Sequence, residues 1–215
     1  MKRLLSVFLT FLISLVVSAC NLSVNKNVYI DDDDKDGGSH TTVNGSIFVG
    51  KNAEVGDCTT VNGRIEIGAG SEVSDMQTVN GSIRLDEDVR VRGDVQTVNG
   101  GVTCDRNVEV RGDVGTINGP IDLRKTRVDR HVTTYNGDIT LEDESIVDGD
   151  IVIENNNGDS SKRRHIRITI TEDSVVKGDV IVKERDDLEV TVYLSRGGKV
   201  EGKIDQRAKV ERNDS

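Results

Sequence analysis

The sequence predicts an all-β protein, and three observations support that fold class. The 215 residues include 22 Gly, one Pro and many Val, Ile, Thr, Asn and Asp, a composition that suits short strands joined by turns. A four-residue motif recurs at nearly constant spacing. Apolar and polar residues also alternate at fixed positions relative to each copy of the motif, as expected for strands with one buried face.

The motif is Thr-Val-Asn-Gly, with Ile or Tyr replacing Val in two of its six copies. Its asparagines are Asn44, Asn62, Asn80, Asn99, Asn118 and Asn136, at steps of 18, 18, 19, 19 and 18 residues. Such regularity is typical of a solenoid, in which each copy stacks on the preceding one.

Three positions in each copy are apolar and are expected to face inward. They hold Cys58, Met76, Val95, Val114 and Val132; Ile47, Ile65, Ile83, Val102, Ile121 and Ile139; and Val49, Ile67, Leu85, Cys104, Leu123 and Leu141. A third segment, for example Val89-Arg90-Val91, alternates in the same way. Three strand-sized pieces of about six residues fit one triangular coil of a parallel β-helix.

An antiparallel β meander is the alternative, because Asn-Gly is also a strong hairpin signal. An odd number of strands per copy would reverse the chain direction from copy to copy, so equivalent residues would not align. The sequence therefore favours a single-stranded parallel β-helix of 18–19 residues per coil over residues 39–205, with irregular coils from about residue 145. Its handedness is not predicted, and residues 206–215 are expected to be a disordered tail.

Two columns of polar residues are expected at the corners of the coils. The asparagines of the motif are predicted to form a hydrogen-bonded ladder at a corner that tolerates the left-handed αL conformation. A neighbouring column contains Asp57, Asp75, Asp94, Asp113, His131 and Asp150. Because stacked carboxylates repel, these side chains are expected either to cap turns or to hold cations.

Residues 1–19 have the pattern of a signal peptide, with Lys2 and Arg3 before an apolar run from Leu4 to Val17. The following Val17-Ser18-Ala19-Cys20 resembles the lipobox of bacterial lipoproteins. That resemblance implies lipid attachment at Cys20, and Asn21 in place of Asp implies the periplasmic face of the outer membrane. An ordinary cleaved secretory signal is the alternative.

Residues 20–38 are polar and acidic and are expected to form a flexible tether. Within this segment Asp32, Asp34, Asp36 and Gly37 match the opening of a calcium loop, but Val43 occupies the position of the final bidentate Glu. A solvated acidic spacer is therefore favoured over a metal site.

Composition and charge argue against several functions. The net charge is −10, and loss of Lys2 and Arg3 with the leader leaves 26 basic against 38 acidic side chains, so nucleic acid is not an expected partner. No nucleophile motif, phosphate loop or cofactor motif appears, and an enzyme is not expected. His131 is the one candidate base for a hexapeptide-type acyltransferase, and the few Tyr and Phe give no evident sugar-stacking surface.

Two other features have a structural and a functional interpretation. Cys58 and Cys104 occupy inward positions on different faces of the predicted coils, so they are expected to be buried and unpaired. The basic cluster Lys162-Arg163-Arg164-His165 could meet phosphates or an acidic partner, but a solvated loop is favoured.

The repeat region resembles the bactofilin group of polymer-forming proteins in its coil length and pattern, although those proteins lack a secretion leader. The expected function is a lipid-anchored cell-envelope scaffold or adhesion-like structural protein that joins the membrane through its lipid, contacts envelope proteins or associates end to end with itself. The alternatives are a calcium- or anionic-glycan-binding module and, less favoured, the acyltransferase.

Overall fold

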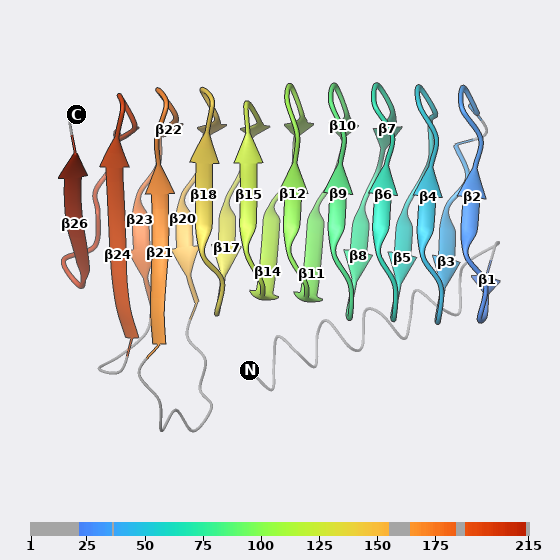
Figure 1. The fold of residues 1–215 in the computed structure, drawn as a ribbon, viewed down its shortest axis with the longest axis horizontal. Coiled ribbons are helices and arrows are strands. Elements are labelled where there is room, and N and C mark those ends of the chain that lie inside the picture. Colours follow the sequence, from blue (N-terminus) through green and yellow to red (C-terminus); the bar gives the residue numbers. More distant parts are fainter. Residues whose placement is uncertain (1–21, 36, 155–163, 184–187, 214–215) are drawn as a thin grey trace.

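The computed structural model describes residues 22–35, 37–154, 164–183 and 188–213. These residues form β-strands and turns without any helix. The chain winds through about nine coils that stack along one long axis (Figure 1). Each full coil contributes one strand to each of three sheets, here named A, B and C.

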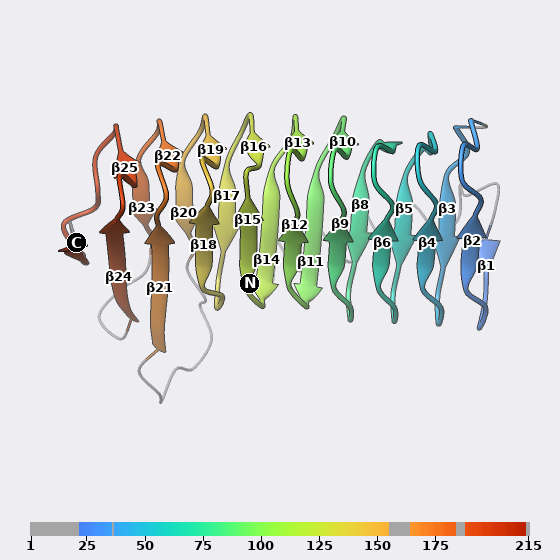
Figure 2. The ribbon, with the colours of Figure 1, turned by 45° about the horizontal axis from the view of Figure 1, so that its top comes forward.

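Sheet A has nine strands: β1 (Leu22–Ser23), β3 (His40–Thr42), β5 (Cys58–Thr60), β8 (Met76–Thr78), β11 (Val95–Asn99), β14 (Val114–Asn118), β17 (Val132–Thr134), β20 (Ile151–Ile153) and β23 (Val180–Val182). Sheet B has ten: β2 (Val28–Ile30), β4 (Ile47–Val49), β6 (Ile65–Ile67), β9 (Ile83–Leu85), β12 (Val102–Cys104), β15 (Ile121–Arg124), β18 (Ile139–Glu142), β21 (Arg164–Ile170), β24 (Leu188–Ser195) and β26 (Ala208–Asn213). Sheet C has seven short strands: β7 (Glu72–Val73), β10 (Arg90–Val91), β13 (Glu109–Val110), β16 (Arg127–Val128), β19 (Ile146–Val147), β22 (Val175–Val176) and β25 (Lys199–Val200), seen along the upper edge in Figure 2.

Neighbouring strands in every sheet run parallel, so the predicted β-helix is confirmed and the antiparallel meander is wrong. Equivalent residues of successive copies are direct partners, as in the pairing of Ile65 with Ile83 and of Ile83 with Val102. The stack also continues past the last motif. Ile139 pairs with Ile168 and Ile168 with Val192, so the longer copies keep their register.

The three apolar columns predicted from the sequence form the core. Cys58, Ile65, Ile83, Val102 and Ile121 are all completely buried, and one continuous cluster runs from Ile30 to Ala208. Burying an aliphatic side chain of this size stabilises a fold by about 1.5–3 kcal/mol. The repeated inward positions therefore provide the main stabilisation of the stack.

The Thr and Gly of the motif have specific structural roles. In five copies the buried Thr hydroxyl donates to a backbone carbonyl of the preceding coil, as Thr78 Oγ1 does to Gly63 O at 2.9 Å. The Gly lies directly against that same carbonyl. A Cβ on Gly81 would lie 1.8 Å from Gly63 O, so a larger residue would push the coils apart.

Two predicted boundaries are wrong. The described part of the presumed tether contains β1 and β2, which pair in parallel with β3 and β4. Residues 208–213 of the presumed tail form β26, which pairs with β24. Both segments are polar or charged in sequence, but they have backbone groups in register with a neighbouring coil, and edge strands need few apolar side chains.

At the predicted corner, Asn25 (φ 58°) in the first described coil has the αL conformation, but the six asparagines of the motif do not. The other non-glycine residues with this conformation occupy the turn that leads from sheet B to sheet C, including Asn52 (φ 55°), Asp88 (φ 62°) and Asn107 (φ 59°). A tight turn after each sheet B strand requires this conformation, which Asn and Asp adopt more readily than most residues.

Candidate functional site

The motif asparagines form the predicted ladder along the corner between sheets A and B. Each carboxamide donates from Nδ2 to Oδ1 of the asparagine one coil earlier, over distances of 2.7–2.9 Å. The ladder starts one coil earlier than predicted, because Asn44 donates to Asn25 at 2.7 Å. At the other end, Arg164 donates to Asn136 Oδ1 and, at 3.2 Å, to the Tyr135 carbonyl. The sequence missed Asn25 because it lies in the segment interpreted as a tether.

Replacing Asn99 with Ala is expected to lower the free energy of unfolding by about 1–2 kcal/mol, because it removes the bonds to Asn80 and Asn118 from an exposed ladder. Chemical denaturation of the mature domain measures this loss. Gln77→Ala is the matched control, since Gln77 faces outward from sheet A and has no recorded side-chain bond among the described residues. Equal losses in both variants would contradict a stabilising ladder.

The predicted Asp column also exists, and its carboxylates cap the backbone of the next coil. Asp94 N–H donates to Asp75 Oδ1 at 2.7 Å, and Asp113 N–H donates to Asp94 Oδ1 at 2.8 Å. The same contact links Asp179 to Asp150 at 2.8 Å. A backbone donor faces each of these carboxylates, which offsets the repulsion expected between stacked negative charges. These contacts support the turn-capping interpretation.

His131 occupies this column and performs the same task as its aspartates. Its backbone N–H donates to Asp113 Oδ1 at 2.9 Å, and its ring Nδ1 accepts the N–H of Asp150 at 3.0 Å. The ring therefore replaces a carboxylate as the acceptor of one rung. This contact gives the candidate base of an acyltransferase a structural role.

The weak calcium candidates lie on the first coil. Asp32 Oδ1 accepts the N–H of Lys51 at 2.7 Å, and the backbone carbonyl of Asp34 accepts the N–H of Glu54 at 2.6 Å. Asp36 lies outside the described residues. Across the described ranges, no three His, Cys, Asp or Glu side chains are grouped so as to hold a metal ion.

Cys58 and Cys104 are buried and unpaired, as predicted. Burial raises the pKa of each thiol from its usual 9.0 to about 12, with a smaller contribution from neighbouring carboxylates. A protonated, enclosed thiol is a poor nucleophile. These residues act as small apolar side chains of the core.

A thiol reagent such as DTNB is expected to leave Cys58 and Cys104 unmodified at pH 8 in the folded protein and to modify both after denaturation. The unfolded chain loses its thiol protons near pH 9, whereas the folded chain holds them to about pH 12. Stability should therefore fall as pH rises between these values. A Cys58→Val, Cys104→Val variant should lose this part of the pH dependence, and rapid labelling of the folded protein would contradict the burial.

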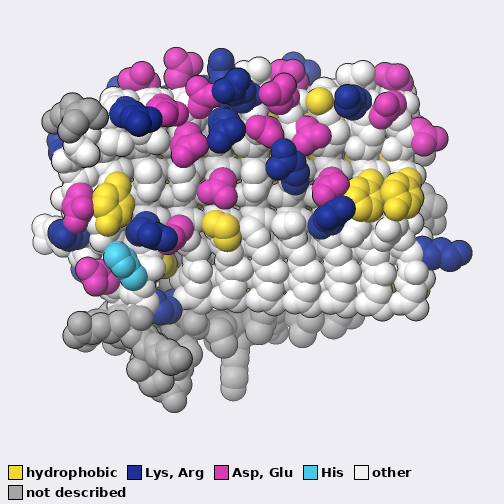
Figure 3. All heavy atoms as spheres, viewed as in Figure 1, with side chains coloured by type: hydrophobic (Ala, Val, Ile, Leu, Met, Phe, Trp, Pro, Cys, Tyr) yellow, Lys and Arg dark blue, Asp and Glu magenta, His cyan; other side chains and the backbone are white. Residues whose placement is uncertain are grey.

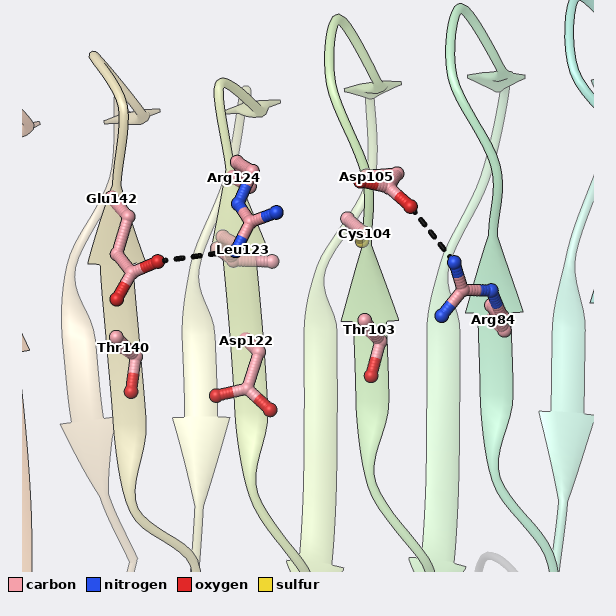
Figure 4. Close-up of a pocket in the computed structure, with 9 residues that line it drawn as sticks. All are labelled: Arg84, Thr103, Cys104, Asp105, Asp122, Leu123, Arg124, Thr140 and Glu142. Carbon is pink, nitrogen blue, oxygen red and sulfur yellow. Dashed lines mark hydrogen bonds and ion pairs between the residues drawn. The ribbon is translucent and has the colours of Figure 1, made fainter.

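The outer face of sheet B has a shallow depression of about 410 Å³ (Figure 4). Thr103, Asp122 and Thr140 lie side by side on β12, β15 and β18 and form its middle. Two ion pairs flank it, Arg84 with Asp105 at 2.9 Å and Arg124 with Glu142 at 3.6 Å. The depression thus presents an exposed carboxylate and two hydroxyls between charged walls, a set of groups that can hydrogen-bond a hydroxyl-rich ligand.

An aromatic pair lies on the same outer column, at the N-terminal end. The rings of Tyr29 and Phe48 stack with centroids 5.1 Å apart, and the Arg64 guanidinium lies 5.1 Å from the Phe48 centroid. Tyr29 is 70% exposed, and Figure 3 shows hydrophobic side chains gathered on the surface at this end of the solenoid. No sugar-stacking surface is evident from the sequence, because Tyr29 falls in the segment interpreted as a tether. The pairing of β2 with β4 brings the rings together.

The remaining predicted sites are only partly described. Cys20, Lys162 and Arg163 lie outside the described residues. Arg164 caps the asparagine ladder, and His165 Nε2 lies 3.2 Å from Thr191 Oγ1. Within the described ranges the basic cluster thus contributes to inter-coil contacts at the start of β21.

No family model matches the chain, and neither a curated protein nor a solved structure shows significant similarity to it. A membrane-spanning helix is absent from the described part of the chain. Function is therefore inferred from the sequence motifs and from the surfaces of the solenoid.

Proposed function

We propose that this protein is a lipid-anchored scaffold of the bacterial cell envelope. The observation that carries this proposal is the lipobox Val17-Ser18-Ala19-Cys20 placed directly before a solenoid of about nine coils. A signal peptide would deliver the chain, Cys20 would hold it to a membrane, and the solenoid would present three long faces to other envelope components. Residues 1–19 would be removed on lipid attachment.

The roles of the repeat support a structural function. The Thr, Asn and Gly of the motif each make or permit a contact between coils, and the Asp column caps the backbone of the next coil. Most charged groups on the faces of sheets B and C pair with each other, as Arg127 does with Asp129 at 3.0 Å. The regularity is thus used in building a stiff rod, with no catalytic group required.

Lipid attachment is tested by expressing the full chain in a Gram-negative host with radiolabelled palmitate. The unmodified sequence should incorporate label and fractionate with the outer membrane, whereas Cys20→Ser should do neither. Cys58→Ser is the matched control, since Cys58 is buried in the core. Label in the Cys20→Ser variant, or none in the unmodified protein, would refute the anchor.

End-to-end association is the second part of the scaffold proposal. At the C-terminal end, Val210 occupies an inward position with 39% exposure, and β26 pairs only with β24 among the described strands. Such an edge can pair with another strand, although the neighbouring inward position holds Arg212, a charge of the kind that hinders edge pairing. Light scattering of the mature protein should detect oligomers, and Arg212→Leu should strengthen them. A strict monomer for both proteins at high concentration would remove this part.

A glycan-binding module is the second candidate, favoured by the aromatic pair and the depression on one face. Tyr29, Phe48 and Asp122 all lie on the outer column of sheet B. Aromatic faces and carboxylates are the groups that recognise sugars in many sites. Glycan-array binding by the mature protein should be lost in Tyr29→Ala and Asp122→Ala and retained in Glu109→Ala on sheet C. No binding to neutral or anionic glycans would exclude this candidate.

Calcium binding is tested on the same preparation. Isothermal titration of calcium should give heat only if the carboxylates of the first coil or of the Asp column hold the ion. The variant Asp94→Ala, Asp113→Ala would remove heat that arises from the column and leave heat that arises from the first coil. Absence of heat in the unmodified protein would exclude a calcium module.

A further inference from the structure

The outer face of sheet A carries no charge across six coils. One column that points away from the core consists of Thr41, Thr59, Gln77, Gln96, Gly115 and Thr133, which are direct partners in successive strands. Thr41 and Thr59 are buried and the other four are half-buried. The second residue of the motif forms the next column: Val43, Val61, Val79, Val98, Ile117 and Tyr135. No Asp, Glu, Lys or Arg occurs in either column, although charged residues make up 31% of the chain.

Two observations show that the second column points away from the core; Val98 and Tyr135, which are only 8% and 7% exposed, are not part of the core cluster. Each of its members follows a Thr whose side chain is buried, and successive residues of a strand point to opposite faces. The backbone bonds from Asn62 N to Val43 O and from Asn80 N to Val61 O align neighbouring copies. At about 4.8 Å per coil, the column from Val43 to Tyr135 is about 24 Å long. Val24, which is 53% exposed, continues it at the N-terminal end.

The other two faces are strongly charged over the same coils. Sheet B carries ion pairs such as Arg64 with Glu66 at 2.8 Å, and sheet C carries Arg92 with Glu72 at 3.3 Å. Figure 3 shows the charged side chains gathered over sheet B and the upper edge, with an uncharged area below them on the side of the asparagine ladder.

The fold does not require valine in the motif. Outward positions of sheet B accept Glu66 and Arg84 within equally regular strands. Strand propensity favours Val, Ile and Tyr. The same propensity applies to the outward positions of sheets B and C, yet many of those positions hold charged residues. The second residue is therefore the one residue of the four-residue motif whose side chain has no assigned contact between coils in the described structure.

The path of the chain places this face near the proposed lipid anchor. The first strand of sheet A begins at Leu22, so only Asn21 separates it from Cys20. Two residues span at most about 7 Å. Because the presumed tether belongs to the solenoid, the anchor would hold the first coil at the membrane surface, at the end of sheet A.

We propose that the mature protein lies along the bilayer with the outer face of sheet A against the lipid headgroups. This inference rests on the proposed lipid attachment at Cys20. Across the six motif coils sheet A can approach the interface without desolvating a charge, and beyond them the column continues into the Glu154–Lys183 ion pair. The acidic side chains of sheets B and C would be repelled by anionic lipids. The valine column would contact the boundary of the apolar layer, and sheets B and C would face away from the membrane.

The test uses tryptophan as a depth probe, because the chain has no native Trp. Full-length protein is purified in its lipidated form as Val79→Trp, and as Arg90→Trp for the matched control on sheet C. Each is reconstituted into phosphatidylcholine vesicles with and without brominated acyl chains. Bromolipid should quench the Val79→Trp fluorescence at least twofold and shift it to the blue, and it should leave Arg90→Trp unchanged. Circular dichroism confirms that both variants are folded.

The outcomes separate this inference from the anchor proposal. Mass spectrometry of the N-terminal peptide reads the lipid on Cys20, and an unmodified Cys20 refutes both proposals. If the protein is lipidated but neither probe is quenched, the solenoid contacts the membrane only through its first coil. This result overturns the inference and leaves the anchor proposal intact. Equal quenching of the two probes also overturns it. A third outcome also overturns the inference. If Val79→Trp fluorescence shifts to the blue without quenching, and Val79→Cys cross-links into dimers, a second copy of the protein covers the face.

Discussion

Deleting one whole coil, residues 60–77, is expected to leave a folded solenoid. The deletion joins Thr59 to Thr78, which is the residue that pairs with Thr60 in the intact protein. Every later column keeps its register, and the core remains continuous. Stability in a solenoid is approximately a sum over repeats and their interfaces. The free energy of unfolding should therefore fall by the contribution of one repeat, on the order of a few kcal/mol.

Deleting half a coil, residues 60–68, is the matched comparison and is expected to have a far larger effect. It removes β6, so one coil has no strand in sheet B and the coils on either side cannot pair there. Hydrogen exchange should show loss of protection in residues 22–59, because too few coils remain before the break to bury a core. Similar protection in the two deletion variants would show that the coils do not depend on register.

Gly81→Ala is expected to lower the free energy of unfolding by about 3 kcal/mol or more. The added Cβ would lie 1.8 Å from Gly63 O and 2.5 Å from Gly63 C, and neither backbone atom can move without separating two coils. Overpacking of this kind typically costs about 1–3 kcal/mol and more where the backbone must shift. Thermal and chemical denaturation of the mature domain measure the loss.

Gly115→Ala is the matched control, because this glycine lies in a strand of sheet A and its Cβ would meet nothing nearer than Thr133 O at 3.8 Å. Ala restricts the unfolded chain more than Gly does, so stability should stay the same or rise by about 0.4–1 kcal/mol. Equal losses at Gly81 and Gly115 would show that the close approach of the coils is not what selects glycine in the motif.

The periodic part of the fold was predictable because one rule generates it. Stacked parallel strands place each residue over its equivalent in the next copy, so the inward isoleucines and the asparagine ladder could be recognised from spacing alone. The Asp column followed in the same way. Spacing alone did not show whether these carboxylates bind cations or cap turns. That question depends on where the backbone N–H donors lie, which only the structure shows.

The ends of the solenoid were not predictable from the pattern. Leu22, Asn25 and Val28 belong to a coil that lacks the full motif, and its acidic turn reads as a tether. Residues 208–213 are charged and read as a tail, yet they pair along β24. An end coil contacts only one neighbouring coil, so its residues need not follow the repeat pattern. Backbone pairing holds the end coil in place, and such pairing cannot be recognised from amino-acid composition.

The sequence by itself determined the parallel solenoid, its coil length, its inward columns and its asparagine ladder, because each of these depends on regular spacing along the chain. Only the tertiary structure decided that the first described strand begins at Leu22, that Tyr29 and Phe48 stack on one face, and that the outer surface of sheet A is uncharged across six coils. The physical reason is that a surface is assembled from single residues of many coils, so its chemistry appears only when neighbouring coils lie side by side.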